Sequence, residues 1–221
     1  PKNTDTASRP YKGNRSKLRP TFDNGATTDE LRFLARRYVA TKDKRYEEGL
    51  SKGLEYILKA QYPNGGWPQY YPSGKGYPRH ITFNDNAMVR LMLFLREVAT
   101  TDRYAFVPAE RRAVAQKAFD RGVECILKCQ IVVEGQKAAW CAQHDEKTFV
   151  PRKARSYELP SISGSESAGI VRFLMSMDKP SPAVVEAIQC AVAWFDEAKL
   201  EGIKQIRVED ESKPRGWDKV V

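Results

Sequence analysis

The chain has 221 residues, a formal net charge of +9 and a sequence pI of about 9.4. A chain of this length can bury one well-packed domain, and none of its apolar runs is long enough to span a membrane. The positive charge favours a polyanionic partner, but the basic residues form no single run and no zinc-finger or RNA-binding signature occurs, which makes nucleic acid a weaker choice than an acidic polysaccharide.

Residues 1–20 are basic and polar, with few apolar residues and no periodicity, and they predict an extended arm on the surface. Residues 21–221 are expected to form one domain. The chain begins with Pro1, so we expect its N-terminus to have been trimmed. The lack of a signal peptide therefore says nothing about export.

Six amphipathic segments follow as three pairs. The spacing of their apolar residues, together with capping residues such as Thr27 or Thr28, predicts helices. No convincing strand run separates them, and the residues after Gly202 are expected to be irregular. The expected helices span 27–39, 46–60, 84–95, 108–129, 165–177 and 182–199.

The pairs are copies of one unit. The segment Gly53-Leu-Glu-Tyr-Ile-Leu-Lys-Ala-Gln61 matches Gly122-Val-Glu-Cys-Ile-Leu-Lys-Cys-Gln130, which lies 69 residues further on, at six of nine positions. Three copies of a helical hairpin predict an all-α fold with the first helices as an inner layer and the second helices outside. An α/α toroid is the natural closed form, and an open solenoid is the alternative.

A polar stretch, residues 152–167, leads into the fifth helix. It holds two arginines, a lysine, two glutamates and several hydroxyls, and it reads either as a functional loop or as a solvated connector. In repeated hairpins the N-termini of all first helices lie at one end, to which the loops after the second helices return. The repeat therefore predicts that residues 21–26, 82–86 and 155–167 meet there, together with Trp67, Gln69, Tyr70, Trp140, Gln143, His144 and Asp145.

Aspartates recur at this end of the repeats. Asp23, Asp85 and Asp145, with neighbouring asparagines, offer the hard oxygen ligands that calcium prefers. The alternative is that Asp23 and Asp85 cap helices or shape turns, which is the commoner role of Asp-Asn pairs. Their recurrence in two repeats favours a metal site.

The aromatic residues, histidines and cysteines indicate a function less specifically than the aspartates do. Trp67, Tyr70 and Trp140 either stack on sugar rings or plug the toroid, and their place beside Gly-Gly-Trp-Pro favours sugar binding. The two histidines, His80 and His144, are expected to make hydrogen bonds rather than act as bases. The four cysteines fit no zinc site and are expected to be mostly buried free thiols: Cys125, Cys129, Cys141 and Cys190.

Four segments, in order, carry a family resemblance. They are Thr21-Phe-Asp-Asn-Gly-Ala-Thr27, Gln61-Tyr-Pro-Asn-Gly-Gly-Trp-Pro-Gln-Tyr-Tyr-Pro72, Phe83-Asn-Asp-Asn-Ala-Met88 and Ala154-Arg-Ser-Tyr-Glu-Leu-Pro-Ser-Ile-Ser-Gly-Ser-Glu-Ser167. They resemble the signature segments of pectate lyases of polysaccharide lyase family 10, over nearly the whole chain. The resemblance implies an α/α toroid and a secreted or periplasmic enzyme.

The resemblance also implies a reaction. It is calcium-dependent β-elimination on polygalacturonate, which gives 4,5-unsaturated oligogalacturonides. The family's base is an arginine, which matches Arg155, with Arg152 as the second choice. Asp23 and Asp85 match the family's active-centre aspartates, and Asp145 is assigned to the same cleft. Residues expected to bind the substrate are Arg152, Lys153, Trp67, Gln69, Tyr70, Trp140 and Glu158.

An arginine base is physically demanding, since guanidinium stays protonated at ordinary pH. Nearby positive charge and alkaline conditions favour its neutral form, so we expect a rate that climbs above neutral pH. The family also has substrate-binding arginines beyond the third hairpin, so we expect the chain to be truncated at its C-terminus, with part of the substrate-recognising side missing.

Two other functions fit the same residues. One is a non-catalytic polyuronide-binding protein, and the other is a toroid hydrolase that would use Glu158 and Glu166 as its carboxylate pair. For the leading function we expect a monomer that binds calcium and an acidic polysaccharide, and neither nucleic acid nor a membrane.

Overall fold

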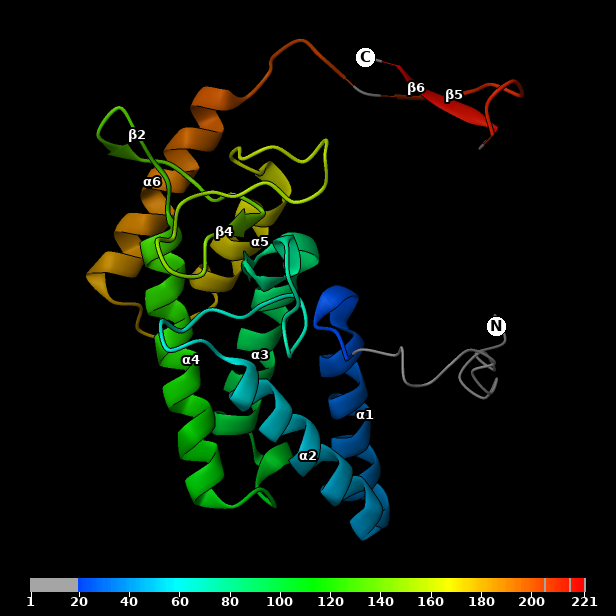
Figure 1. The fold of residues 1–221 in the computed structure, drawn as a ribbon, viewed down its shortest axis with the longest axis vertical. Helices are drawn as coiled ribbons and strands as arrows, with labels where there is room; N and C mark the ends of the chain where they lie inside the picture. Colours follow the sequence, from blue (N-terminus) through cyan, green and yellow to red (C-terminus); the bar gives the residue numbers. More distant parts are fainter. Residues whose placement is uncertain (1–19, 205, 215, 221) are drawn as a thin grey trace.

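The structure, a computed structural model, describes residues 20–204, 206–214 and 216–220 (Figure 1). Most of the arm expected at residues 1–20 lies outside these ranges. Six α-helices form three hairpins, which confirms the expected all-α class. They are α1 (Ala26–Thr41), α2 (Lys44–Ala60), α3 (Ala87–Thr100), α4 (Ala109–Cys129), α5 (Gly164–Met175) and α6 (Pro182–Ala198).

The helices begin where local chemistry allows. The Asp43 side chain accepts a hydrogen bond from the backbone N–H of Arg45 and so caps α2. Ser181 caps α6 in the same way through the N–H of Val184, and Pro182 occupies the first turn, where its missing N–H costs nothing.

The hairpins lie side by side, with the first helices in contact along the row α1, α3 and α5. Helix α3 is central in Figure 1 and is buried along most of its length, with Met88, Leu91 and Phe94 in the core. The expected inner position is therefore confirmed for α3. Among the described residues, no helix is long and apolar enough to cross a membrane.

The 69-residue repeat has a structural basis. Helices α2, α4 and α6 end at Ala60, Cys129 and Ala198, each 69 residues after the previous one. The glutamine after each of the first two ends joins neighbouring outer helices: the Gln61 amide donates to the carbonyl of Ala118 in α4, and the Gln130 amide donates to that of Ala187 in α6. These acceptors are again 69 residues apart.

Backbone hydrogen bonds tie the loops to the starts of the first helices. The carbonyl of Gln69 accepts from the N–H of Phe22, and that of Ala142 accepts from Phe83. The carbonyl of Trp67 accepts from Thr82, and that of Trp140 accepts from Ser163, at the start of the next hairpin. These hydrogen bonds hold the starts of α1, α3 and α5 and the loops after α2 and α4 at one end of the molecule, as the repeat predicted.

Three small antiparallel sheets were not expected. They pair β1 (Ile81–Thr82) with β4 (Gln143–His144), β2 (Val132–Val133) with β3 (Gln136–Lys137), and β5 (Ile206–Glu209) with β6 (Trp217–Val220). Two-residue strands leave no periodic signal in a sequence. The prediction of irregular structure after Gly202 was wrong, because Ile206 and Val208 alternate with polar residues in a hairpin that extends away from the helical body (Figure 1).

Candidate active site

Two matching turns precede α1 and α3. Phe22-Asp-Asn-Gly-Ala26 contains the 3₁₀ turn η3 (Asp23–Gly25), and Phe83-Asn-Asp-Asn-Ala87 contains η5 (Asn84–Asn86). Each turn ends with two successive left-handed residues, at φ of 49° and 75° in the first and 50° and 58° in the second. Asn, Asp and Gly are the residues that tolerate this conformation, which explains their concentration here.

The turns bring Asp23 and Asp85 together. Burial raises the pKa of Asp85, and repulsion by Asp23 and a hydrogen bond with it raise that pKa further. The side-chain amide of Gln69 donates to Asp23 Oδ2 at 3.3 Å, and that of Asn84 donates to Asp85 Oδ2 at 2.7 Å. Helix capping does not explain these aspartates, because Gly25 and Asn86 are the N-cap residues and make no side-chain capping bond.

The aspartate pair fits a hard cation. Asp23 Oδ1 is buried and has no hydrogen-bond partner among the described residues, an arrangement that is costly unless another group meets it. Two close carboxylates that repel one another form the oxygen-rich, negative donor set that calcium prefers.

Arg155 lies close enough to this pair for its charge to lower the pKa of Asp85. Its guanidinium is held by Glu158: Nε donates to Glu158 Oε2 at 2.9 Å, Nη2 pairs with Oε1, and the backbone N–H of Arg155 also donates to Oε2. These bonds raise the pKa of Arg155 above its ordinary value. The positive surroundings that would favour a neutral arginine are therefore absent among the described neighbours of Arg155 in the free protein.

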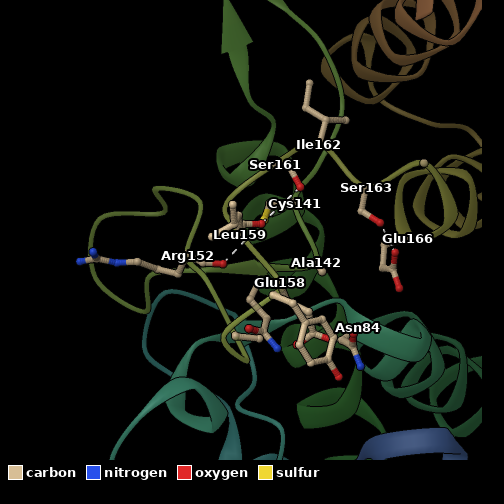
Figure 2. Close-up of a pocket in the computed structure, with 14 residues that line it drawn as sticks. Asn84, Cys141, Ala142, Arg152, Glu158, Leu159, Ser161, Ile162, Ser163 and Glu166 are labelled. Carbon is tan, nitrogen blue, oxygen red and sulfur yellow. Dashed lines mark hydrogen bonds between the residues drawn. The ribbon is translucent and has the colours of Figure 1, made fainter.

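A cleft of about 430 Å³ lies between the 152–167 loop and the 141–143 segment (Figure 2). Asn84, Glu158 and Glu166 line it, so it adjoins the turn before α3 and the loop that carries Arg155. On its wall, Gln143 is only 2% exposed and its side-chain oxygen has no partner among the described residues. The cleft is thus lined mainly by polar residues, which offer hydrogen bonds to sugar hydroxyls.

Arg152 lines the cleft through its backbone end, while its side chain points away from the other labelled residues in Figure 2. Its guanidinium is bonded to Asp145, with Nε and Nη2 at 3.0 Å and 2.9 Å from Oδ2. Lys153 is exposed and has no ion-pair partner among the described residues. Arg155 is therefore the better placed of the two arginines for chemistry.

Asp145 does not join the other aspartates. Partial burial raises its pKa, but the N–H groups of Thr148 and Lys147 and the Arg152 side chain outweigh that effect, and the pKa lies well below its usual range. The structure groups Asp145 with His80 and Glu146 instead. The local turn and Arg152 already bond the Asp145 carboxylate, so the structure favours Asp23 and Asp85 as the metal ligands, and the place of Asp145 in the same site stays a prediction.

The second acidic group, His80, Asp145 and Glu146, has its ligand atoms within 4.8 Å of one another. The Glu146 carboxylate already pairs with Arg79 at 3.0 Å and with His80 Nδ1 at 2.9 Å. Both carboxylates are thus compensated by arginines, and the group acts as an ion-pair network that joins two loops.

The expected roles of Trp67 and Trp140 as sugar platforms are wrong in this structure. Their exposures are 1% and 0%, and their indole N–H groups donate to the carbonyls of Ile57 and Ile126. They are equivalent core residues of the two repeats and leave no ring face for a sugar. Tyr70 is half-buried, and the Gln69 amide donates to Asp23 and so orients it.

The predicted hydrogen bonding of the histidines and the predicted free cysteines are confirmed. His144 is buried, accepts a hydrogen bond from the N–H of Cys141 and bonds the carbonyl of Phe149 through Nδ1. Burial lowers its pKa to about 4. Cys125, Cys129 and Cys141 are buried free thiols, and Cys190 is a partly exposed one.

Sequence reasoning missed Tyr157. Its ring lies 5.1 Å from the Arg155 guanidinium, and it is 72% exposed. The signal was present, since Tyr157 belongs to the loop that carries Arg155. It was overlooked because Trp67 and Trp140 were assigned as the sugar-binding aromatic residues.

Comparison with known proteins shows the family of this chain. Residues 2–219 match the family described as pectic acid lyase. A search of curated proteins found no match. The solved family 10 polysaccharide lyase from Cellvibrio cellulosa is 36% identical, with a TM-score of 0.79 over 89% of this chain and 61% of that one.

An aspartate-to-alanine mutant of the same lyase, in complex with trigalacturonic acid, gives the same identity and TM-score and is covered over 62% of its length. The chain thus spans less than two thirds of the solved lyases that it matches. From the family match over nearly its whole length, together with this shared fold, the chain belongs to the pectic acid lyase family.

Proposed function

We propose that the protein is a secreted or periplasmic pectate lyase that cleaves polygalacturonate by calcium-dependent β-elimination. The observation that carries the proposal is the meeting of Asp23 and Asp85, from two repeats, with Arg155 beside them. The relative solved with trigalacturonic acid supports the substrate class. Residues 21–221 would form one catalytic domain.

Asp23 and Asp85 would hold the calcium ion, with Gln69 and Asn84 fixing their orientation. Calcium, when bound, supplies positive charge that makes the C5 proton of the uronate more acidic. Arg155 removes that proton at its guanidinium, the C5–H electron pair forms the 4,5 double bond, and the C4–O bond of the glycosidic link breaks. The departing oxygen takes a proton from water and becomes the hydroxyl of the new reducing end. Lys153 and the guanidinium of Arg155 attract the anionic chain to the cleft.

Glu158 opposes this base, because it raises the pKa of Arg155 in the free protein. Proton abstraction therefore uses a small neutral fraction of Arg155, which grows with pH. The rate should climb above neutral pH. Glu158 itself, a carboxylate facing an anionic substrate, orients Arg155 rather than binding the uronate, which revises its expected role.

A non-catalytic polyuronide-binding protein is the second candidate. The bonding between Arg155 and Glu158 favours it, since a permanently charged arginine recognises carboxylates well. A hydrolase gains no such support. Arg155 lowers the pKa of Glu158, and the hydroxyl of Ser163 already donates to Glu166, so neither carboxyl group is set up as a general acid.

The test is to incubate polygalacturonate with the protein, with and without calcium, and to follow the ultraviolet absorbance of the unsaturated product. We expect a calcium-dependent rise that Arg155→Lys reduces by roughly 100-fold or more. Asp178→Asn, which changes an exposed acid remote from the cleft lining, is the control. Near-full activity of Arg155→Lys at saturating calcium would refute the assignment of the base, and binding without absorbance would select the second candidate.

A further inference from the structure

One aromatic ring stands open at the candidate site. Of the described residues that line the cleft, Tyr157 is the single aromatic one. Its exposed fraction of 72% compares with 47% for Phe33, the other exposed large aromatic side chain of the described chain. An exposed tyrosine at a cleft offers apolar area to a ligand at little conformational cost.

The turn that carries Tyr157 is well held. The N–H of Glu158 donates to the carbonyl of Arg155, and the N–H of Ala154 donates to the carbonyl of Glu158, both at 3.0 Å. Arg155 is bonded to Glu158 across the same turn. The guanidinium of Arg155 therefore lies against the tyrosine ring in a defined place, 5.1 Å from its centroid.

This pairing matches the two faces of a uronate. A galacturonate unit presents C–H groups, which pack on aromatic rings, and a carboxylate, which pairs with guanidinium. The buried Trp67 and Trp140 leave the site without a tryptophan platform. Tyr157 beside Arg155 supplies both parts of the recognition within three residues.

We propose that Tyr157 is a sugar-binding residue of this cleft, whose ring packs on a galacturonate unit while Arg155 pairs with a carboxylate of the same chain. The substrate class rests on the proposed function, but the role of the ring does not depend on turnover. Tyr157 thus replaces the two tryptophans as the aromatic platform.

The experiment is affinity electrophoresis of the protein through gels that contain polygalacturonate and a chelator, which would stop calcium-dependent turnover. We expect Tyr157→Ala to weaken binding about 10-fold, since aromatic truncation at a binding site removes roughly that much affinity. Tyr157→Phe keeps the ring and should stay within about twofold of the unmodified protein. Phe33→Ala removes an exposed aromatic from α1 and should bind normally.

Each outcome has a defined reading. Equal binding by Tyr157→Ala and the unmodified protein would overturn the inference, as would loss of binding in Tyr157→Phe, which would assign the hydroxyl rather than the ring. An unmodified protein that the polymer does not retard at all would also overturn it. Suppose that Tyr157→Ala is the one variant that binds weakly, and that the unmodified protein makes no unsaturated product with calcium. The lyase proposal then fails, and the inference about Tyr157 stands.

Discussion

Asp85 shows how a proposed metal ligand can work against folding. Its pKa lies above the ordinary value of 3.8, so folding favours its protonated form. Without a cation, the free energy of unfolding should therefore fall as pH rises through and above that value. A bound cation would remove this cost of ionising Asp85 in the folded protein.

Asp85→Asn should stabilise the metal-free protein while abolishing activity. Asparagine tolerates the left-handed backbone at φ 50°, and the change removes the repulsion with Asp23. We expect the melting temperature at pH 7 with a chelator to rise by roughly 2 °C, and the calcium-dependent rate to fall by roughly 100-fold. A melting temperature that falls would show that the two carboxylates do not repel one another.

His144 predicts a pH dependence of stability. Its pKa of about 4 in the folded protein lies below the ordinary 6.5, so the stability that neutral His144 provides is complete above pH 6.5 and is lost as pH falls toward 4. From pH 6.5 to 5 the free energy of unfolding should fall by about 2 kcal/mol. Urea unfolding measures it, and His144→Gln, though less stable, should be nearly flat over this window. An equal slope in both proteins would place the titrating group elsewhere.

Sequence reasoning succeeded for one pair of residues and failed for another. Asp23 and Asp85 were predicted together because a repeat places equivalent turns at one end of the fold. Trp67 and Trp140 were assigned outward because aromatic residues near glycines often lie exposed. The deciding contact, an indole N–H on a helix carbonyl ten or fourteen residues back, has no signature in a single sequence.

The repeat explains why the second helices end where they do. Gln61 and Gln130 follow the last residues of α2 and α4, and each donates both to its own loop and to the next outer helix. The sequence match included both glutamines and both glycines, Gly53 and Gly122, at which a side chain would meet the packed first helix. The repeated residues are thus those that join helices.

Gln130→Met should be strongly destabilising. Methionine fills similar volume but leaves the carbonyl of Ala138 without its Gln130 donor and removes the link to the helical carbonyl of Ala187, in a buried place. We expect a loss of about 2 kcal/mol in the free energy of unfolding, measured in urea. Gln136→Met, on an exposed strand, should change it by less than about 0.5 kcal/mol. Equal effects would mean that the paired carbonyls contribute nothing specific.

The molecule as a whole combines a local site with a broad positive charge. The all-α class, the three hairpins and the end of the fold that carries the site were predictable, because periodicity and repetition extend over many residues. The small strands and the bonding between Arg155 and Glu158 were not, since they depend on the path of individual loops.

The net charge of +9 leads to a last prediction about salt. Salt screens the long-range attraction of a polyanion over a distance of about 10 Å at 0.1 M. It screens direct contacts between the bound substrate and the residues of the site much less. Raising sodium chloride from about 0.02 to 0.2 M, at fixed free calcium, should lower kcat/KM for polygalacturonate several-fold through KM, with kcat nearly constant. The effect should be smaller for trigalacturonate, which carries fewer charges. If kcat fell as much as kcat/KM for both substrates, salt would be acting on the site formed by Asp23, Asp85 and Arg155, and the distributed charge would have no part in capture of the polymer.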